Sequence, residues 1–260
     1  MKEIFAELSD YRELLYQMTV RDLLLRYKQT AMGFGWAVLV PLLNTLVFSV
    51  IFMRVAPIQT RVPYPLFAFC GLLAWNCTAS ALRFAVTSLT SNTTLVTKVY
   101  FPREIFPLSA VAVSLVDFAV ASTVLVAMLV YYRVTPGAAI LFLPVILLVQ
   151  TALTAGFALA LAMANLFYRD VKYLFDVALT VWMFASATVY PSDALGHGVL
   201  GFIVRVNPMT AVIEAYRSVL LYGTMPDPVS FIGATLFTAV LVPSAWLLFH
   251  RLEFQFAEFA

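Results

Sequence analysis

The sequence predicts an all-α membrane protein with six transmembrane helices, an N-terminal amphipathic helix at the membrane interface, and short re-entrant helices on the outer side before the last span. Three observations lead to this prediction. Hydrophobic residues make up 62% of the chain and charged residues only 12%, against about 45–50% and about 25% in soluble domains. Long apolar segments recur along the chain, and Lys and Arg are unequally distributed between the two sides that these segments define.

The first 33 residues are expected to form a cytoplasmic helix at the interface. Residues 9–28 place polar and apolar side chains on different sides of a helix, with Leu14, Leu15, Met18 and Leu25 on the apolar side. Charges continue as far as Lys28, so a cleavable signal is not expected. The helix either anchors the chain or provides a docking surface for a partner.

Residues 34–251 are expected to form a six-span membrane domain, followed by a cytoplasmic tail at residues 252–260. A helix needs about 20 apolar residues to cross the hydrocarbon core. The expected spans are residues 34–53, 62–82, 105–130, part of 134–168, the short segment 177–190, and 229–249.

The region of residues 191–228 is expected to enter the outer face and return. Charged residues interrupt it before 18 apolar residues accumulate. Asn207 and Pro208 predict a helix start, with Asn207 as N-cap and Pro208 at the first helical position, and the helix is expected to end near Gly223. Lipid tolerates such a segment only where protein or water covers its ends.

The basic residues predict that both termini are cytoplasmic. Ten of them fall on the inner side in this arrangement and five on the outer side. The inner set is Lys2, Arg12, Arg21, Arg26, Lys28, Lys98, Arg103, Arg169, Lys172 and Arg251, and the outer set is Arg54, Arg61, Arg133, Arg205 and Arg217. Arg83 lies within or at the end of a span.

Several kinds of chemistry are not expected. The net charge of +2 gives no reason to expect a nucleic-acid partner. No Gly is followed by Lys, so the chain lacks a phosphate-binding G-x-x-x-x-G-K-[ST] loop. His197 and His250 are far apart and lack a neighbouring ligand in the sequence, so no metal site is expected. Only Asp117 lies near the centre of a span, whereas proton-coupled transporters usually carry several such acids.

Asp117 therefore needs a partner, because a charge at mid-bilayer costs at least about 2.5–3.5 kcal/mol. We expect an intramembrane pair with Arg83, the nearest basic residue by depth, although a substrate contact is the alternative. A stripe of small residues at four-residue spacing predicts close packing of the fourth span. Its members are Ala152, Gly156, Ala160 and Ala164.

Four segments together resemble the permease subunits of ABC exporters for O-antigen, capsule and teichoic-acid polymers, in order and spacing over nearly the entire chain. They are Arg26-Tyr27-Lys28-Gln29-Thr30 with Met32-Gly33, Trp36 and Pro41; residues 95–107 with Lys98, Phe101-Pro102 and Phe106-Pro107; Tyr168-Arg169-Asp170-Val171; and Asn207-Pro208-Met209 with Tyr216-Arg217.

The resemblance implies a homodimer in the bacterial inner membrane, joined to two ATP-binding subunits, with a lipid-linked polysaccharide or other glycolipid as substrate. ATP and magnesium would then bind the partner subunit, and this chain would hold no cofactor and would not be an enzyme by itself. Residues 90–104 would be the cytoplasmic coupling loop. The residues expected to contact the ATPase are Asn92, Lys98, Phe101, Pro102, Arg103, Arg169 and Asp170. A solvated turn is the alternative for this loop.

A sugar presents hydroxyls and apolar ring faces, so aromatic surfaces with sparse polar groups suit its path. Phe48, Phe52, Trp182, Phe184 and Tyr190 are the candidates, and the alternative for each is interfacial or lipid-facing packing. Two other functions remain open: an ABC permease for small amphiphiles such as drugs, and a non-transporting assembly scaffold. The outer segment favours polymer export over the export of small amphiphiles. The coupling loop favours polymer export over a non-transporting scaffold.

Overall fold

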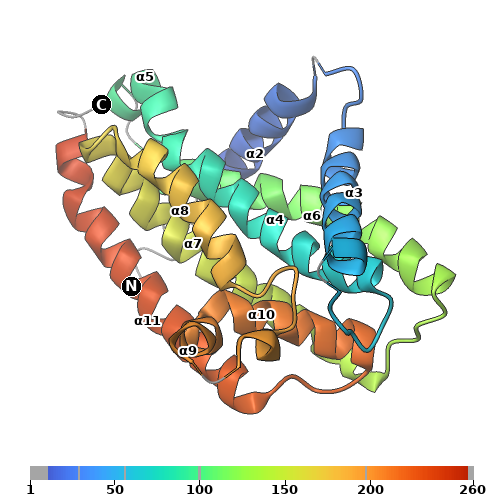
Figure 1. Cartoon of the computed structure of the whole chain (residues 1–260). Coiled ribbons are helices and arrows are strands. Elements are labelled where there is room, and N and C mark those ends of the chain that lie inside the picture. Colours follow the sequence, from blue (N-terminus) through green and yellow to red (C-terminus); the bar gives the residue numbers. More distant parts are fainter. Residues whose placement is uncertain (1–10, 29, 56, 99–100, 197, 257–260) are drawn as a thin grey trace.

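The computed structural model is helical throughout the described residues, with no strand among them (Figure 1). It describes residues 11–28, 30–55, 57–98, 101–196 and 198–256. The predicted all-α membrane fold is confirmed, because five helices in this part of the chain are long and apolar enough to cross a membrane.

The five candidate spans contain most of the predicted segments. They are α3 (Gly35–Val50) continued by the π-helix η1 (Ile51–Val55), α4 (Tyr64–Ser88), α6 (Ile105–Tyr131), the 3-10 helix η3 (Ala138–Phe142) continued by α7 (Leu143–Phe167), and α11 (Pro228–Leu252) continued by η6 (Glu253–Gln255). The remaining elements are α2 (Arg12–Tyr27), η2 (Thr90–Asn92), α5 (Thr93–Lys98), α8 (Val171–Ala185), η4 (Ser192–Leu195), α9 (Val199–Val206), α10 (Pro208–Arg217) and η5 (Ser218–Tyr222).

The sixth span has two candidates. Helix α8 begins before the predicted segment 177–190 and ends at Ala185, and its 15 residues extend only about 22 Å. Helices α9 and α10–η5 reach the length and composition of a span only together, and they are bent by 74° where they meet. The bend suits the predicted re-entrant segment but equally suits a broken span.

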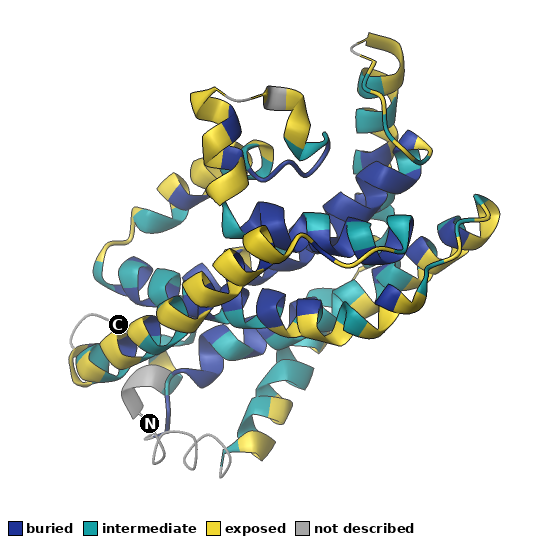
Figure 2. Ribbon diagram, turned by 90° about the horizontal axis from the view of Figure 1, so that it is seen from below, coloured by how far each residue is buried: buried dark blue, intermediate teal, exposed yellow. Residues whose placement is uncertain are grey.

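Helix α4 lies at the centre of the bundle. In its most apolar window 83% of the residues are buried, against 11% for the span that begins at Gly35 (Figure 2). It contacts α3, α6, α7, α8 and α10. Residues on every side of α4 therefore meet protein instead of lipid.

A buried polar network joins α4 to α7 and α10. The Gln150 side-chain amide on α7 donates to the Ala74 carbonyl at 2.8 Å and to the Thr78 hydroxyl at 3.2 Å, both on α4. The Tyr216 hydroxyl on α10 donates to the Gln150 side-chain oxygen at 2.7 Å. Because no water is available in the bilayer core, such groups must find partners within the protein. The network fixes α7 and α10 against α4.

Asn207 starts α10 as predicted. Its Oδ1 accepts from the Met209 backbone N–H at 3.0 Å and from the Trp182 indole at 3.2 Å, while Nδ2 donates to the Ala185 carbonyl at 2.9 Å. The helical segment ends at Gly223, whose φ of 65° is left-handed. Asn207 thus caps α10 and also attaches it to the end of α8.

Arg217 is fully buried beside α4. Its guanidinium donates to the carbonyls of Ala187 at 2.9 Å and Thr188 at 2.6 Å, and to Glu214 at 2.8 Å. It also lies 3.7 Å from the centroid of the Phe67 ring. The charge is thereby satisfied internally, and the turn after α8 is held against α4 and α10.

Two glycines allow close helix packing. A Cβ at Gly71 would lie 2.2 Å from the Thr188 carbonyl oxygen and 2.5 Å from an Arg217 nitrogen. A Cβ at Gly156 would lie 2.9 Å from Leu241 on α11. The predicted close packing of the fourth span is therefore confirmed at Gly156.

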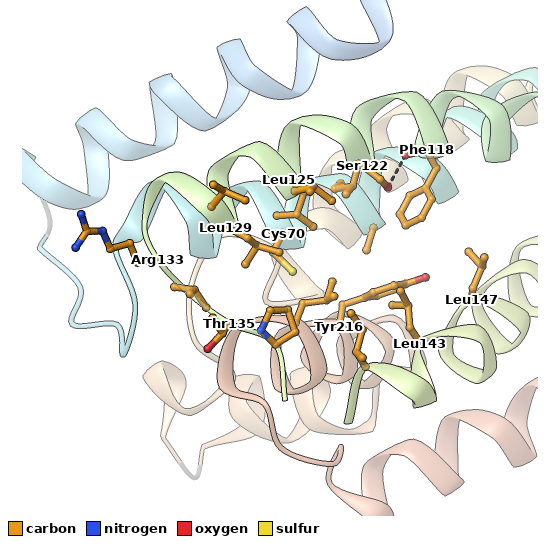
Figure 3. Close-up of a pocket in the computed structure, with 18 residues that line it drawn as sticks. Cys70, Phe118, Ser122, Leu125, Leu129, Arg133, Thr135, Leu143, Leu147 and Tyr216 are labelled. Atoms are coloured by element: carbon orange, nitrogen blue, oxygen red, sulfur yellow. Dashed lines mark hydrogen bonds between the residues drawn. The ribbon is translucent and has the colours of Figure 1, made fainter. Parts of the chain in front are cut away.

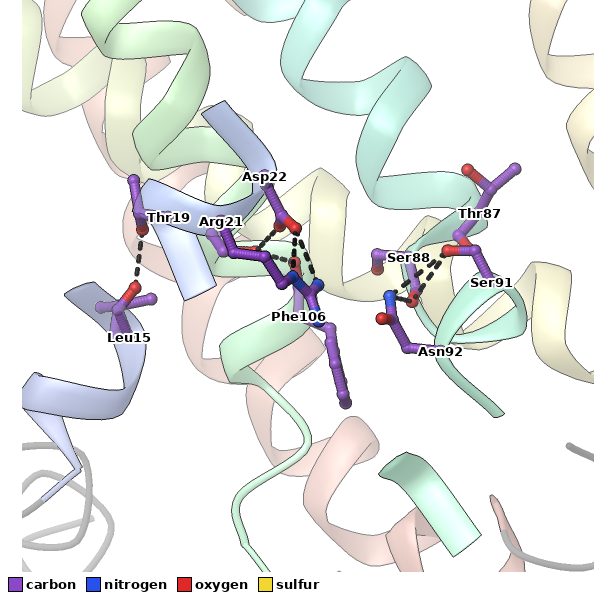
Figure 4. A network of polar contacts seen from close by, with 10 residues as sticks. Leu15, Thr19, Arg21, Asp22, Thr87, Ser88, Ser91, Asn92 and Phe106 are labelled. Atoms are coloured by element: carbon purple, nitrogen blue, oxygen red, sulfur yellow. Dashed lines mark hydrogen bonds and ion pairs between the residues drawn. The ribbon is translucent and has the colours of Figure 1, made fainter. Parts of the chain in front are cut away.

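Helix α2 packs against α6. Asp22 accepts from the Ser109 hydroxyl at 2.9 Å and pairs with the adjacent Arg21 at 2.7 Å (Figure 4). Leu14, Leu15 and Met18 pack against a buried cluster as expected from the helical periodicity, but Leu25 is 74% exposed. An exposed Leu25 is compatible with the expected position of this helix at the membrane interface, where lipid would cover it.

We expect Gly71→Ala to lower the free energy of unfolding by about 1–3 kcal/mol, because the new methyl group overlaps the Thr188 carbonyl and the Arg217 side chain. Gly233→Ala is the matched control, since open space surrounds that position on α11 and alanine is the better helix former by up to about 1 kcal/mol. Thermal unfolding of both variants in detergent measures the difference. Equal unfolding temperatures for the two variants would contradict this account of Gly71.

Candidate functional site

A cavity of about 520 Å³ lies between the end of α2, helix α3, and the facing sides of α4 and α6. We call it the polar cavity. Its lining combines charged, amide and hydroxyl groups with aromatic rings, including Arg26, Tyr27, Asp117, Asn76, Ser80, Trp36, Phe84 and Phe118. Among cavities in a membrane-spanning bundle, this composition suits a ligand with both polar and apolar faces.

Asp117 is the centre of the charged part of this cavity. It forms an ion pair with Arg26 and accepts a hydrogen bond from the Tyr27 hydroxyl at 2.5 Å. The side chains of Arg26 and Asp117 are only 14% and 16% exposed. Burial and the Asp117 hydrogen bond raise the pKa of Tyr27 to about 12, so its hydroxyl remains a donor at neutral pH. Two residues at the end of α2 therefore neutralise and orient the one mid-span acid.

Arg26 has further contacts that fix its position. Its guanidinium lies 3.8 Å from the Phe84 ring centroid and 3.4 Å from the Ser80 hydroxyl. Both residues are on α4, whereas Asp117 is on α6. Arg26 therefore links three helices, as an arginine can when its planar face stacks on a ring while its edges donate.

The predicted pair between Arg83 and Asp117 was wrong. Arg83 instead lies 3.6 Å from Asp176 on α8, and the two side chains are 58% and 66% exposed. The prediction considered partners only on the spans, whereas in the fold α2 packs beside Asp117. Arg26 and Tyr27 were visible in the sequence as part of the motif before the first span, but nothing in that motif revealed their role.

Asn76 supplies an unused donor in the polar cavity. Its Nδ2 is buried and finds no hydrogen-bond partner in the described part of the chain. A buried donor without a partner costs about 1–3 kcal/mol.

A second cavity of about 650 Å³, which we call the apolar cavity, adjoins the first. Leu73 and Phe118 line both. Its other lining residues are mostly aliphatic, with Cys70 and Leu125 opposite Tyr216 and Leu143, and Arg133 lies at one end (Figure 3). The two cavities together extend along the α4–α6 contact from Asp117 to the end of α6.

The five aromatic residues expected in the substrate path line neither cavity. Phe48 and Phe52 stack at 6.3 Å between centroids and pack beside Tyr64, at the end of α3. Trp182 meets Trp75 edge-on at 5.5 Å. Phe184 and Tyr190 contact each other through the Tyr190 hydroxyl and the Phe184 carbonyl, and the Phe184 side chain is 45% exposed. These five residues therefore lie in three separate places, and none of them is beside Asp117.

The segment expected to contact the ATPase is partly internal. Phe101 and Pro102 are buried, and Phe101 packs against Phe106 in a cluster that includes Phe249 and Phe256. Arg103 bonds through its guanidinium to the Glu253 carbonyl. The prediction that Phe101 and Pro102 are exposed for docking was wrong, because the C-terminal residues of α11 and η6 fold back over them.

The other predicted coupling residues lie at the same end of the bundle. Asn92 ends η2 with its amide bonded to the Ser88 carbonyl at 2.8 Å, and Lys98 ends α5. Arg169 and Asp170 are exposed in the turn between α7 and α8. Asn165, near this turn, reaches the Thr90 hydroxyl of η2 at 3.4 Å. The two connections therefore form one surface.

We expect Arg26→Gln and Asp117→Asn each to lower stability by about 2–4 kcal/mol, since either change leaves the other partner poorly compensated in a mostly buried place. The double variant should lose less than the sum of the two. The matched control is Arg83→Gln with Asp176→Asn, an exposed pair whose coupling should be about 0–1 kcal/mol.

Thermal unfolding of the four variants and both double variants in detergent measures the two coupling energies. Equal coupling at the two pairs, or full additivity for Arg26 and Asp117, would refute the assigned partnership.

Comparison with known proteins agrees with this architecture. Residues 13–221 match the ABC-2 type transporter family. The chain is 28% identical to the O-antigen export system permease protein RfbA of Myxococcus xanthus over 260 residues, which are 99% of each chain. Two Klebsiella pneumoniae proteins of the same name are 29% identical over 249 residues, covering 95% of this chain and 94% of theirs. The chain is therefore a multi-pass membrane protein that belongs to the ABC-2 type transporter family.

Proposed function

We propose that this chain is the permease subunit of an ATP-driven exporter that moves an O-antigen type polysaccharide, carried on a lipid, across the bacterial inner membrane. The observation that carries the proposal is similarity to O-antigen permeases over 99% of the chain, through every span and connection. The family indicates a transmembrane subunit without catalytic activity of its own. Hydrolysis of ATP with magnesium then belongs to a separate subunit.

The polar cavity is the proposed contact site for the sugar. Ring faces of Trp36 and Phe84 provide apolar surfaces for pyranose rings, and Asn76 offers a buried unpaired donor. Asp117 pairs with Arg26, and Arg83, the other charged residue of the lining, pairs with Asp176, so these charges already have partners within the chain. Sparse polar groups and aromatic faces allow contact without tight binding.

The apolar cavity is the proposed place for the lipid part of the substrate. Its aliphatic lining excludes sugar hydroxyls, because burying them without partners is costly. The same lining suits a small amphiphile, since drug-sized ligands occupy pockets of about 300–1,000 Å³. Export of amphiphiles is therefore the second candidate function.

A second copy of the chain is the proposed partner for the exposed side of α3. This helix lines the polar cavity near its start, and further apolar residues along it are exposed, including Leu43, Leu46, Val47 and Val50. A homodimer across this side would enclose the polar cavity between two chains. Membrane lipid would cover the remaining apolar surface.

One ATP-binding subunit is proposed to dock on each chain, on the surface formed by η2, α5 and the α7–α8 turn. The homodimer would then bind two copies. Exposed Ser91, Tyr168, Arg169 and Asp170 supply its polar and aromatic contacts. Charges of both signs at such a rim set orientation and partner choice. We propose this surface in place of Phe101 and Pro102 as the contact, with both chain termini on the same, cytoplasmic side of the membrane as the ATPase.

Deletion of the gene in its own bacterium tests the function. Surface polysaccharide should disappear while lipid-linked polymer accumulates in the inner membrane, and a plasmid copy should reverse both effects. Unchanged surface polysaccharide together with increased sensitivity to amphiphilic drugs would contradict polymer export and support the second candidate.

The docking surface predicts a separation between two kinds of variant. Arg169→Glu combined with Asp170→Lys should weaken binding of the ATPase at least about tenfold, equivalent to about 1.4 kcal/mol, because both side chains are exposed. The thermal stability of the permease should be unchanged. Phe101→Ala should instead lower stability by about 3–5 kcal/mol, because the ring is in a packed core.

Co-purification with the ATPase and thermal unfolding measure the two effects. Should Phe101→Ala keep full stability yet lose the ATPase, the buried position assigned to Phe101 would be wrong.

A further inference from the structure

Three ligand-type side chains from distant parts of the chain meet beside the coupling segment. Glu104 directly precedes α6, His250 lies in the last turn of α11, and Glu253 begins η6. One ligand atom from each lies within 4.8 Å of the other two. Spacing along the sequence gives no sign of this cluster, because Glu104 lies 146 residues before His250.

The distances in this cluster do not fit hydrogen bonds. His250 Nδ1 lies 3.6 Å from a Glu104 oxygen and 3.5 Å from a Glu253 oxygen. An N–H···O hydrogen bond is about 2.7–3.2 Å between heavy atoms. Ligands bound at about 2.0–2.2 Å in a tetrahedron are separated by about 3.3–3.6 Å. The two measured separations match that geometry.

Glu104 supplies an independent sign of a missing ligand. Its side chain is only 3% exposed, and its Oε2 has no hydrogen-bond partner in the part of the chain that the structure describes. A buried carboxylate without compensation is costly, and a bound cation would supply that compensation.

Glu253 is already oriented for this role. The Arg103 guanidinium donates to the Glu253 backbone carbonyl, and Glu253 Oε2 is the oxygen that lies 3.5 Å from His250 Nδ1. Hydrogen bonds from surrounding residues orient the side chains that bind a metal ion directly. His250 is 43% exposed, so solvent has access to the cluster and a water molecule can take the fourth position.

We propose that Glu104, His250 and Glu253 bind one divalent transition-metal ion of the zinc type. One imidazole and two carboxylates form a donor set that suits Zn²⁺, and they are too few for the six or more oxygen ligands of Ca²⁺. The ion joins the end of the coupling segment to the end of the last span. It thereby holds the C-terminal residues over Phe101.

Zinc titration of the purified full chain in nanodiscs, after treatment with a chelator, tests the site. Calorimetry should show one equivalent of Zn²⁺ bound, and Zn²⁺ should raise the unfolding temperature. Cobalt should bind in its place with the visible spectrum of a tetrahedral complex. His250→Gln and Glu104→Gln should each weaken Zn²⁺ binding by at least about tenfold.

Matched controls use the same substitutions elsewhere: His197→Gln and Glu13→Gln should bind as the unmodified chain does. If His250→Gln or Glu104→Gln fails to fold, the Zn²⁺ affinity of Glu253→Gln and the cobalt spectrum of the unmodified chain test the site instead. Binding below one equivalent, an octahedral cobalt spectrum, or equal affinity in the site and control variants would overturn the proposal.

Discussion

Satisfaction of buried polar groups around α4 is the constraint on which the rest of the structure depends. This helix contacts five others, and 83% of the residues in its most apolar window are buried. Gln150 donates to Thr78 and to the backbone of α4 and accepts from Tyr216, and Arg217 is held beside Gly71 further along. In lipid, where apolar packing alone provides little specificity between helices, these contacts determine which helices are adjacent.

The same constraint produces the candidate site. Asp117 on α6 cannot remain unpaired at its depth, and Arg26 and Tyr27 reach it only because α2 packs against α6. That packing creates the polar cavity between α2, α3, α4 and α6. A polymer that must move needs neutral surroundings with weak contacts, and an internally paired acid beside aromatic rings provides them. The membrane domain therefore uses one charged contact both for packing and for shaping the cavity.

Local patterns in the sequence predicted what local physics determines. Hydropathy located the long spans, and Asn207 with Pro208 predicted the start of α10, because capping involves only neighbouring residues. Contacts between distant segments were harder to predict. Asp117 was assigned to Arg83 by depth, although Arg26 is closer in the fold. Phe101 appeared available for docking because nothing local shows that Phe249 and Phe256 cover it. Aromatic side chains such as Trp182 carry no sign in the sequence that separates packing from substrate contact, so the five path residues remain a prediction, and none of them lines the two cavities.

The central claim is that the sugar contacts the polar cavity beside Asp117. Photo-crosslinking during ATP-driven export in membrane vesicles tests it most directly, with benzoylphenylalanine placed at Trp36 in the cavity or at Phe184 outside it. The account predicts that radiolabelled polysaccharide is captured at position 36, only while ATP is hydrolysed, and not at position 184. Capture at position 184 with none at position 36 would contradict the account and would return the path to the aromatic residues of α8.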